Sequence, residues 1–308
     1  MFNKILVPLD GSALAAAALL PASAWARRDN AELILVGAAS TSHVAEIGAY
    51  LATMVNCLSA EGLTVRAMIP LGIPENEINE EAELGHADLI VMTTHGRTGL
   101  DAMLHPSVTW RVLAQTSAPI LVSRFADEEQ AEPPVHQLRF MTDATAPIMA
   151  PLDGSPEAER ALPLARQIAE EFGNPIVLVY VGEPLLLAES AGAQDLMPGG
   201  SVGWWMEQAE RYLWAKQEEL LRDGLRVRAI TTVGAPARVI LALAQEYQAG
   251  LIIMASRGRG WLGRLVLGSV TRSVVSQSDI PVLLVRRFVS KPAEEARAEQ
   301  TLTPTVAR

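Results

Sequence analysis

An internal repeat constrains this chain more than any other feature of its sequence. Residues 5–12 (ILVPLDGS) return as residues 148–155 (IMAPLDGS), and residues 87–124 align without a gap on residues 249–286. The offset between the copies is 153 − 10 = 143 in the first match and 258 − 96 = 162 in the second. Because each copy of such a repeat is a folding unit, the 308 residues are predicted to form two similar domains.

The composition is that of a globular chain with an acidic balance of charge. Apolar residues make up 49% and charged residues 19%, which is typical of core-forming domains. The formal net charge of −10 argues against nucleic acid and anionic membranes as partners, because both require basic surface. The single cysteine, Cys57, cannot form an intrachain disulfide, so the sequence predicts a reducing, cytoplasmic location.

An alanine-rich stretch at residues 13–25 has some features of a secretory signal. It is too short to cross a bilayer, Pro21 interrupts it, and a strand-like run at residues 5–9 precedes it. The corresponding stretch of the second copy lies in mid-chain. We therefore expect a buried helix here.

Strand-like and helix-like patterns alternate along each copy. In the first copy, apolar or alternating runs predict strands at residues 4–9, 32–38, 63–71, 88–93 and 119–124. Helices are predicted between them, among them one from residue 49 to 61. This order predicts a Rossmann-like α/β fold of two tandem open, mainly parallel five-stranded sheets with helices on both faces.

The same patterns suggest where the domains begin and end. The predicted segments are a first domain at 1–125, an acidic, proline-containing linker at 126–145, a second domain at 146–287 and a mobile tail at 288–308. The second copy is longer by 162 − 143 = 19 residues. The surplus falls near residues 183–203, which we expect to form a loop over the carboxyl edge of the sheet.

Candidate binding residues of the second copy gather where a parallel sheet binds ligands, beyond the carboxyl ends of its strands. Gly268 and Ser269 open the last helix, with Ser269 as the expected N-cap, and exposed amides of a first helical turn attract anions. Gly258 lies ten residues earlier and would form the other wall of the same loop. The alternative is ordinary helix capping without a ligand.

The spacing of these residues resembles that of the universal stress protein family, which binds ATP with the motif G-x2-G-x9-G-[S/T]. The second copy has Ala255-x2-Gly258-x9-Gly268-Ser269, and its Pro-x-Asp at 151–153 and last strand also resemble that family. The resemblance implies ten nucleotide-binding residues: Asp153 at the ribose or adenine, Pro151, Val181 and Met254 along the base, Ala255 near the ribose, and Gly258, Gly268, Ser269, Val270 and Thr271 around the phosphates. Ala255 departs from the motif, because its methyl group replaces a glycine.

The first copy departs further from this pattern. Its line-up reads Thr93-x2-Gly96-x9-Pro106-Ser107. Proline lacks an amide hydrogen and has a fixed φ, and Thr93 adds bulk where a glycine is expected. Asp10 remains, but an Asp-Gly-Ser turn also has a purely structural use. The nucleotide is therefore predicted in the second copy, and a structural or regulatory role in the first.

Other signals in the sequence are weaker. Residues 258–263 spell G-x-G-x-x-G, but they follow the fourth strand of the copy instead of the first, which argues against a dinucleotide site. No P-loop motif occurs. His95, Asp101 and His105 lack matching counterparts and a further ligand, so loop residues are favoured over a metal site. No residue pattern indicates a catalytic nucleophile or general base.

The resemblance implies an ATP-binding regulatory protein of the stress response, with at most slow ATP hydrolysis and with Mg²⁺ as a companion ion left open. It also implies that the two domains pair through their last strands, and that the chain forms homo-oligomers. The main alternative is a nucleotide-free protein-interaction module of the same fold. An adenine-nucleotide enzyme of related fold is disfavoured, because the Ser-Gly-Gly phosphate loop is missing near the first strand of either copy.

Overall fold

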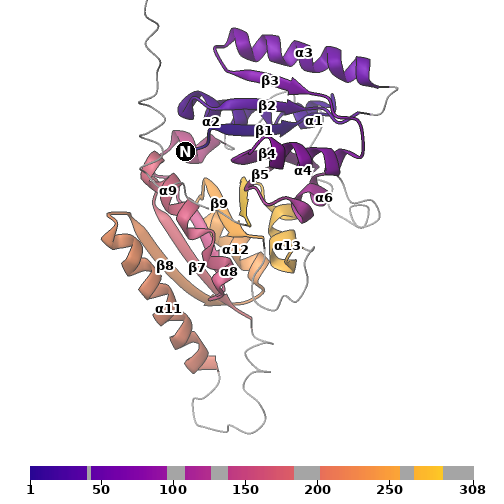
Figure 1. Cartoon of the computed structure of the whole chain (residues 1–308). Helices are drawn as coiled ribbons and strands as arrows, with labels where there is room; N and C mark the ends of the chain where they lie inside the picture. The colour runs from indigo at the N-terminus through magenta and orange to yellow at the C-terminus, as the bar shows by residue number, and fades with distance from the viewer. Residues whose placement is uncertain (40–42, 96–107, 126–137, 184–201, 257–266, 287–308) are drawn as a thin grey trace, which may run out of the picture.

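The strands of both copies join in one sheet. The computed structural model describes residues 1–39, 43–95, 108–125, 138–183, 202–256 and 267–286. Within these ranges the strands form a single sheet in the order β3-β2-β1-β4-β5-β10-β9-β6-β7-β8 (Figure 1). Every neighbouring pair is parallel except β5 and β10, which are antiparallel. The predicted α/β fold with a mainly parallel sheet is confirmed.

The elements alternate along each copy as the sequence predicts. The first copy comprises β1 (Lys4–Pro8), α1 (Ala13–Ala16), α2 (Leu19–Asp29), β2 (Glu32–Val36), α3 (Val44–Ala60), β3 (Val65–Met68), α4 (Pro74–Leu84), β4 (Leu89–His95), α6 (Val108–Gln115) and β5 (Ile120–Phe125). After α7 (Arg139–Thr142), the second copy comprises β6 (Ile148–Leu152), α8 (Pro156–Glu159), α9 (Leu162–Phe172), β7 (Ile176–Gly182), α11 (Val202–Arg222), β8 (Val227–Val233), α12 (Pro236–Glu246), β9 (Leu251–Ala255), α13 (Ser269–Gln277) and β10 (Val282–Val285).

One boundary differs clearly from its prediction. The helix expected from residue 49 begins at Val44, because Ile47 and Leu51 pack over Gly37 at the end of β2. A Cβ atom added at Gly37 would lie 2.4 Å from Cγ2 of Ile47. The glycine thus lets the first turns of α3 approach the strand, an effect that local helix patterns do not reveal.

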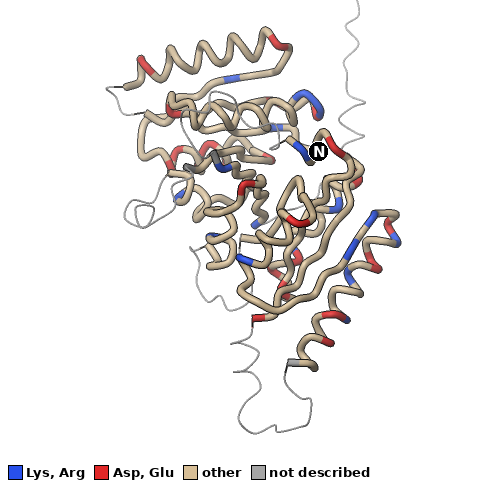
Figure 2. The backbone as a smooth tube through the Cα atoms, turned by 180° about the vertical axis from the view of Figure 1, so that it is seen from behind, with Lys and Arg blue, Asp and Glu red and all other residues tan. Residues whose placement is uncertain are grey.

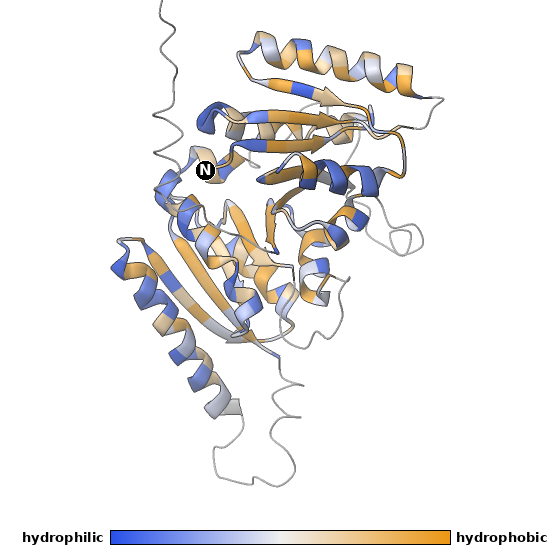
Figure 3. Cartoon of the chain, in the orientation of Figure 1, coloured by the Kyte–Doolittle hydropathy of each residue, from blue (hydrophilic) through white to orange (hydrophobic). Residues whose placement is uncertain are grey.

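Helices cover both faces of the sheet, and each face has its own apolar core. On one face the buried side chains of α2, α3, α9 and α11 pack on alternate strand residues, as Leu51 and Leu213 do. On the other face α4, α6, α12 and α13 do the same, with Val112 and Val274 among the fully buried residues. Figure 3 shows the central strands as predominantly apolar, and in Figure 2 charged residues lie mainly on the helices and at strand ends. Burial on both faces explains the nearly continuous apolar runs of the strands.

The two copies meet through their last strands, about a pseudo-twofold axis. In the β5–β10 pair, Leu121 lies opposite Leu283. These two leucines occupy the same position in the two copies, because 121 + 162 = 283, so the pseudo-twofold axis passes between them. Arg124 donates to the Ser276 carbonyl at 3.2 Å, and the equivalent Arg286 donates to the Ala114 carbonyl at 2.6 Å. Each arginine therefore caps the last helix of the other copy, where the helix dipole favours a cation. The predicted pairing of the domains through their last strands is seen here.

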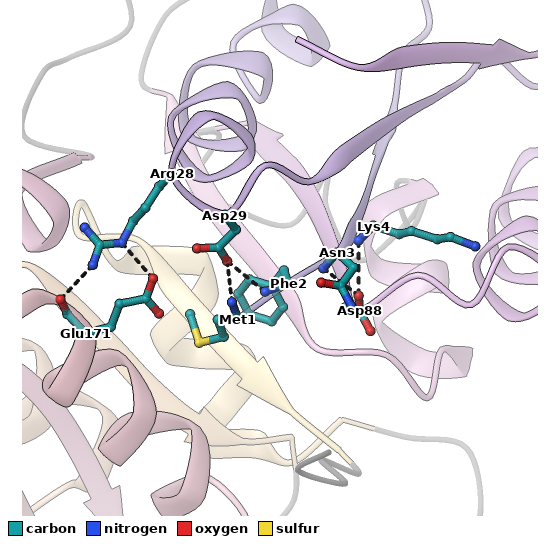
Figure 4. A network of polar contacts seen from close by, with 8 residues as sticks. All are labelled: Met1, Phe2, Asn3, Lys4, Arg28, Asp29, Asp88 and Glu171. Carbon is teal, nitrogen blue, oxygen red and sulfur yellow. Dashed lines mark hydrogen bonds and ion pairs between the residues drawn. The ribbon is translucent and has the colours of Figure 1, made fainter. Parts of the chain in front are cut away.

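A second contact between the copies is aromatic. Phe140 of α7 is fully buried, with its ring centroid 5.4 Å from that of Trp25 in α2 and 6.0 Å from that of Phe172 in α9. The last part of the segment predicted as a linker is thus helical and joins both copies. Beside this cluster, Arg28 donates to the Glu171 carboxylate at 2.7 Å (Figure 4). Burial, together with the nearby Asp29 carboxylate, raises the pKa of Glu171, while its hydrogen bond with Arg28 opposes that rise.

Candidate nucleotide site

The candidate site of the second copy lies at the switch point of its strand order. From β6 the chain passes to β7 on one side of the sheet, whereas β9 pairs with β6 on the other side. Such a reversal opens a crevice beyond the carboxyl ends of the two central strands, where open α/β sheets bind ligands. Asp153 directly follows β6, and Ala255 is the last residue of β9. The two residues therefore flank this crevice.

Asp153 forms the turn that leads into α8. Its Oδ1 atom accepts hydrogen bonds from the amide of Ser155 at 2.9 Å and from the hydroxyl of Ser155 at 2.6 Å. The Ser155 hydroxyl in turn accepts from the amide of Ala158 at 3.2 Å and so caps the helix. Sequence analysis singles out Asp153 but not Ser155, although Ser followed by Pro-Glu is a recognisable helix start. This network fixes the position of the carboxylate at the crevice.

The three residues expected along the base lie at the carboxyl ends of adjacent strands. Pro151 of β6, Val181 of β7 and Met254 of β9 all belong to the sheet face that α12 and α13 cover, because side chains on one face alternate with a period of two. Pro151 and Met254 are buried, and Val181 is half-buried. The fold therefore places these three apolar residues on one side of the crevice.

The start of α13 is tied to the end of β9 by two hydrogen bonds. The amide of Gly268 donates to the Ser256 carbonyl at 3.0 Å, and the Thr271 hydroxyl donates to the Ala255 carbonyl at 3.1 Å. The expectation that Ser269 is the N-cap is wrong. Gly268 is the N-cap, since its carbonyl accepts from the Arg272 amide at 2.9 Å and its backbone is extended (φ −59°, ψ 148°).

This geometry leaves a set of amides at the helix start. The four orphan amides of a helix belong to its N-cap and first three residues, here Gly268, Ser269, Val270 and Thr271. Gly268 uses its own amide for the bond to Ser256, so the remaining donors are the following three. Ser269 is exposed, whereas Thr271 is 3% exposed. The other predicted phosphate residue, Gly258, lies outside the described residues.

Ser256 has a role that sequence analysis does not identify. It is 4% exposed, its carbonyl holds the Gly268 amide, and its own amide donates to the Val285 carbonyl at 3.1 Å. Ser256 thereby joins β9, β10 and the start of α13. Its position directly after the buried strand is the only sequence signal for this role.

The first copy has the same turn after its first strand, but a different side chain at the end of its fourth strand. Asp10 accepts from the amide and hydroxyl of Ser12 at 2.9 and 2.6 Å, the same distances as in the second copy. The Thr93 hydroxyl, however, donates to the Leu14 carbonyl at 2.8 Å and so bridges β4 to α1. The counterpart of Thr93 is Ala255, which has no hydroxyl to make this bond. Burial, with the Asp10 carboxylate nearby, raises the pKa of Tyr50 on α3.

Comparison with known proteins gives a consistent result. The sequence model of the universal stress protein family matches residues 1–124 and 145–286. The chain belongs to the universal stress protein family. A universal stress protein of Mycolicibacterium smegmatis is 26% identical over 309 residues, which cover 92% of this chain and 96% of that protein. One from Thermus aquaticus is 34% identical over 142 residues, which cover 45% of this chain and 97% of that protein.

A solved structure supports the fold of the tandem arrangement. The crystal structure of a universal stress protein from Archaeoglobus fulgidus superposes with a TM-score of 0.68 at 22% identity, covering 92% of this chain and 96% of that one. Among the described residues, no helix is both long and apolar enough to cross a membrane.

Proposed function

We propose that the second copy of this universal stress protein binds ATP at the crevice between β6 and β9, and that the chain acts in the stress response as a nucleotide-dependent regulatory protein. The observation that carries the proposal is the start of α13, where the amides of Ser269, Val270 and Thr271 have no acceptor within the helix. These donors and the positive end of the helix dipole suit a polyphosphate.

The remaining candidate residues complete this proposal. Asp153 would bind a ribose or adenine group, and Pro151, Val181 and Met254 offer an apolar surface to the base. Ala255 would lie near the ribose, and Gly258 and Gly268 would let the phosphates approach the backbone. A Mg²⁺ ion that accompanies ATP would be held mainly by phosphate oxygens and water, as this ion prefers.

We assign the nucleotide to the second copy because the two crevices differ in chemistry. In the first copy the Thr93 hydroxyl bonds to the Leu14 carbonyl and so ties β4 to α1, and in the sequence alignment Pro106 replaces Gly268. The first copy then has a structural or regulatory role. The protein would act in the cytoplasm as a homo-oligomer, without nucleic acid or membrane as partners.

Binding, not turnover, is the proposed use of the nucleotide. Asp153 already accepts two hydrogen bonds from Ser155, an arrangement that suits a positioned binding group better than a general base. We infer at most slow ATP hydrolysis. Steady release of phosphate at several turnovers per second would instead indicate an enzyme.

Matched substitutions in the two copies test the assignment. Asp153→Ala and Asp10→Ala remove the same local turn, so any general effect of its loss is common to both. We expect Asp153→Ala to weaken ATP binding about 10- to 100-fold, as loss of a hydrogen bond to a charged group does, and Asp10→Ala to leave it unchanged. Isothermal titration calorimetry measures both. Equal losses in the two variants, or a loss only in Asp10→Ala, would contradict the proposal.

The alternative, a nucleotide-free interaction module, makes a different prediction. Mass spectrometry of small molecules released by denaturing the purified protein distinguishes the two, because only the first function predicts a stoichiometric adenine nucleotide. An absence of ATP binding in the titration as well would favour the interaction module.

A further inference from the structure

A large cavity lies between the two copies, and none of the candidate nucleotide residues that the structure describes lines it. Its volume is about 1240 Å³. One wall is the amino-terminal edge of the first copy, with Asn3 before β1, Asp88 before β4 and Ser117 before β5. The opposite wall is formed by α9 and α11 of the second copy, including Arg166 and Lys216. Figure 4 shows Asn3 and Asp88 side by side at this edge.

The equivalent space at the other side of the pseudo-twofold axis is filled. There α7 lies against Gly250, the residue before β9 and the counterpart of Asp88 (88 + 162 = 250). A Cβ atom added at Gly250 would lie 2.8 Å from the backbone nitrogen of Phe140. The Phe140 ring packs on Trp25 of α2, the helix equivalent to α9. The helix α7 thus fills the space between the amino-terminal edge of the second copy and a helix of the first.

The open cavity lies next to the end of β10, which is the strand equivalent to β5. Leu284 pairs with Ile120, so in the same antiparallel register Arg286 lies opposite Ala118, a residue that lines the cavity. The Arg286 guanidinium also donates to the carbonyl of Thr116, another lining residue, at 3.0 Å. The chain therefore leaves β10 at the mouth of the cavity.

We propose that residues 287–308 of the same chain occupy this cavity, as the segment after β5 occupies its counterpart. Phe140 lies 140 − 124 = 16 residues after Arg124, and Leu302 lies 302 − 286 = 16 residues after the equivalent Arg286. Leu302 takes the place of Phe140. The docked segment holds the two copies together on the side of the axis that α7 does not reach, in place of the mobile tail that the sequence predicts.

The size and charge of the cavity suit a polypeptide. Its volume exceeds the ~300–1,000 Å³ that is typical of small-molecule pockets. The lining carries more acidic than basic side chains: Glu83, Asp88, Glu159, Glu170, Glu219 and Asp223 against Arg166 and Lys216. Residues 287–308 contain four Lys and Arg, cations that the acidic side chains of the lining can pair with.

Disulfide trapping in the full-length chain tests this proposal. Ser117 lines the cavity and is exposed, so Ser117→Cys should not disturb folding. The test variant carries Ser117→Cys and Leu302→Cys, together with Cys57→Ser to remove the native thiol. The control variant carries Leu302→Cys alone and keeps Cys57, an exposed thiol on α3 outside the cavity, as the other thiol.

A docked segment raises the local concentration of one thiol at the other. We expect the 117–302 disulfide to form within one chain, about tenfold or more faster than the 57–302 disulfide, as peptide mapping by mass spectrometry would measure. Equal rates for the two pairs, or no 117–302 disulfide, would overturn the proposal. A 117–302 disulfide found only between two chains would also overturn it, because the occupant would then be a second copy of the protein.

Discussion

At the scale of single residues, the two copies have different side chains at several equivalent positions of the backbone, and these side chains make different contacts. Asp10 and Asp153 make the same turn with the same distances, yet the Thr93 hydroxyl ties β4 to α1, whereas its counterpart Ala255 has no hydroxyl. Asp88 and Gly250 are also equivalent. The Asp88 carboxylate accepts from the amides of Asn3 and Lys4, whereas Gly250 leaves room for α7. The first difference supports the different roles proposed for the two copies, and the second explains why α7 packs on only one of them.

Gly250 offers a direct test of how tightly α7 is packed. In Gly250→Ala the new methyl group would meet the backbone of Phe140 at 2.8 Å, and backbone cannot move aside as a flexible side chain can. Overpacking of this kind costs about 1–3 kcal/mol of unfolding free energy. Urea denaturation measures the loss.

Gly203→Ala serves as the control, since nothing lies within 4 Å of a Cβ atom added at Gly203 on α11. Alanine there should leave the unfolding free energy unchanged or raise it slightly, because Gly203 lies in the first turn of α11 and its surroundings are open. A Gly250→Ala variant as stable as the control would mean that α7 does not lie against β9 as described.

At the scale of elements, the equivalent helices α6 and α13 meet at the pseudo-twofold axis, where they carry different side chains at the same position. The Arg272 guanidinium lies 5.7 Å from the centroid of the Trp110 ring, and these residues are counterparts because 110 + 162 = 272. In a symmetric pair of identical domains each would meet its own copy, and two arginines would repel each other. The tandem chain instead places a cation over an aromatic ring.

Exchange of these two side chains tests whether the seam depends on their complementarity. Trp110→Arg should lower the unfolding free energy by about 0.5–1 kcal/mol through loss of an exposed cation–π contact, with like-charge repulsion in addition. Adding Arg272→Trp should recover most of that loss, because it restores one arginine and one tryptophan at the axis. Denaturant titrations of the wild type, both single variants and the double variant give the coupling free energy. Additive effects would mean that the contact contributes nothing.

The sequence predicts the elements well where local pattern determines them and poorly where distant residues do. The buried strands and their order along the chain follow from apolar runs and from the repeat. The helix α7 does not, since residues 126–145 read as a polar linker, and Phe140 is buried only because Trp25 and Phe172 come together from different copies. Likewise, the motif spacing predicts that Gly268 and Ser269 lie at the helix start. It does not predict that the Gly268 amide donates to the Ser256 carbonyl, because that bond depends on where β9 ends in space.

At the scale of the whole molecule, the chain is an internal dimer with unequal halves. One continuous sheet, two arginine caps and an aromatic cluster join the copies. These connections offer a path by which a ligand in one half can influence the surface of the other, provided that the ligand binds one conformation of the chain more strongly than another. The account therefore depends on where the nucleotide binds.

Photolabelling with 8-azido-ATP, followed by peptide mapping, distinguishes a nucleotide bound in the second copy from one bound in the first. The reactive azide is attached to the base, so it reports the residues around the adenine. The account predicts that ATP-protected labelling falls on peptides from residues 148–183 and 251–256 of the second copy. Protected labelling confined to the equivalent peptides of the first copy, residues 5–40 and 89–94, would contradict it.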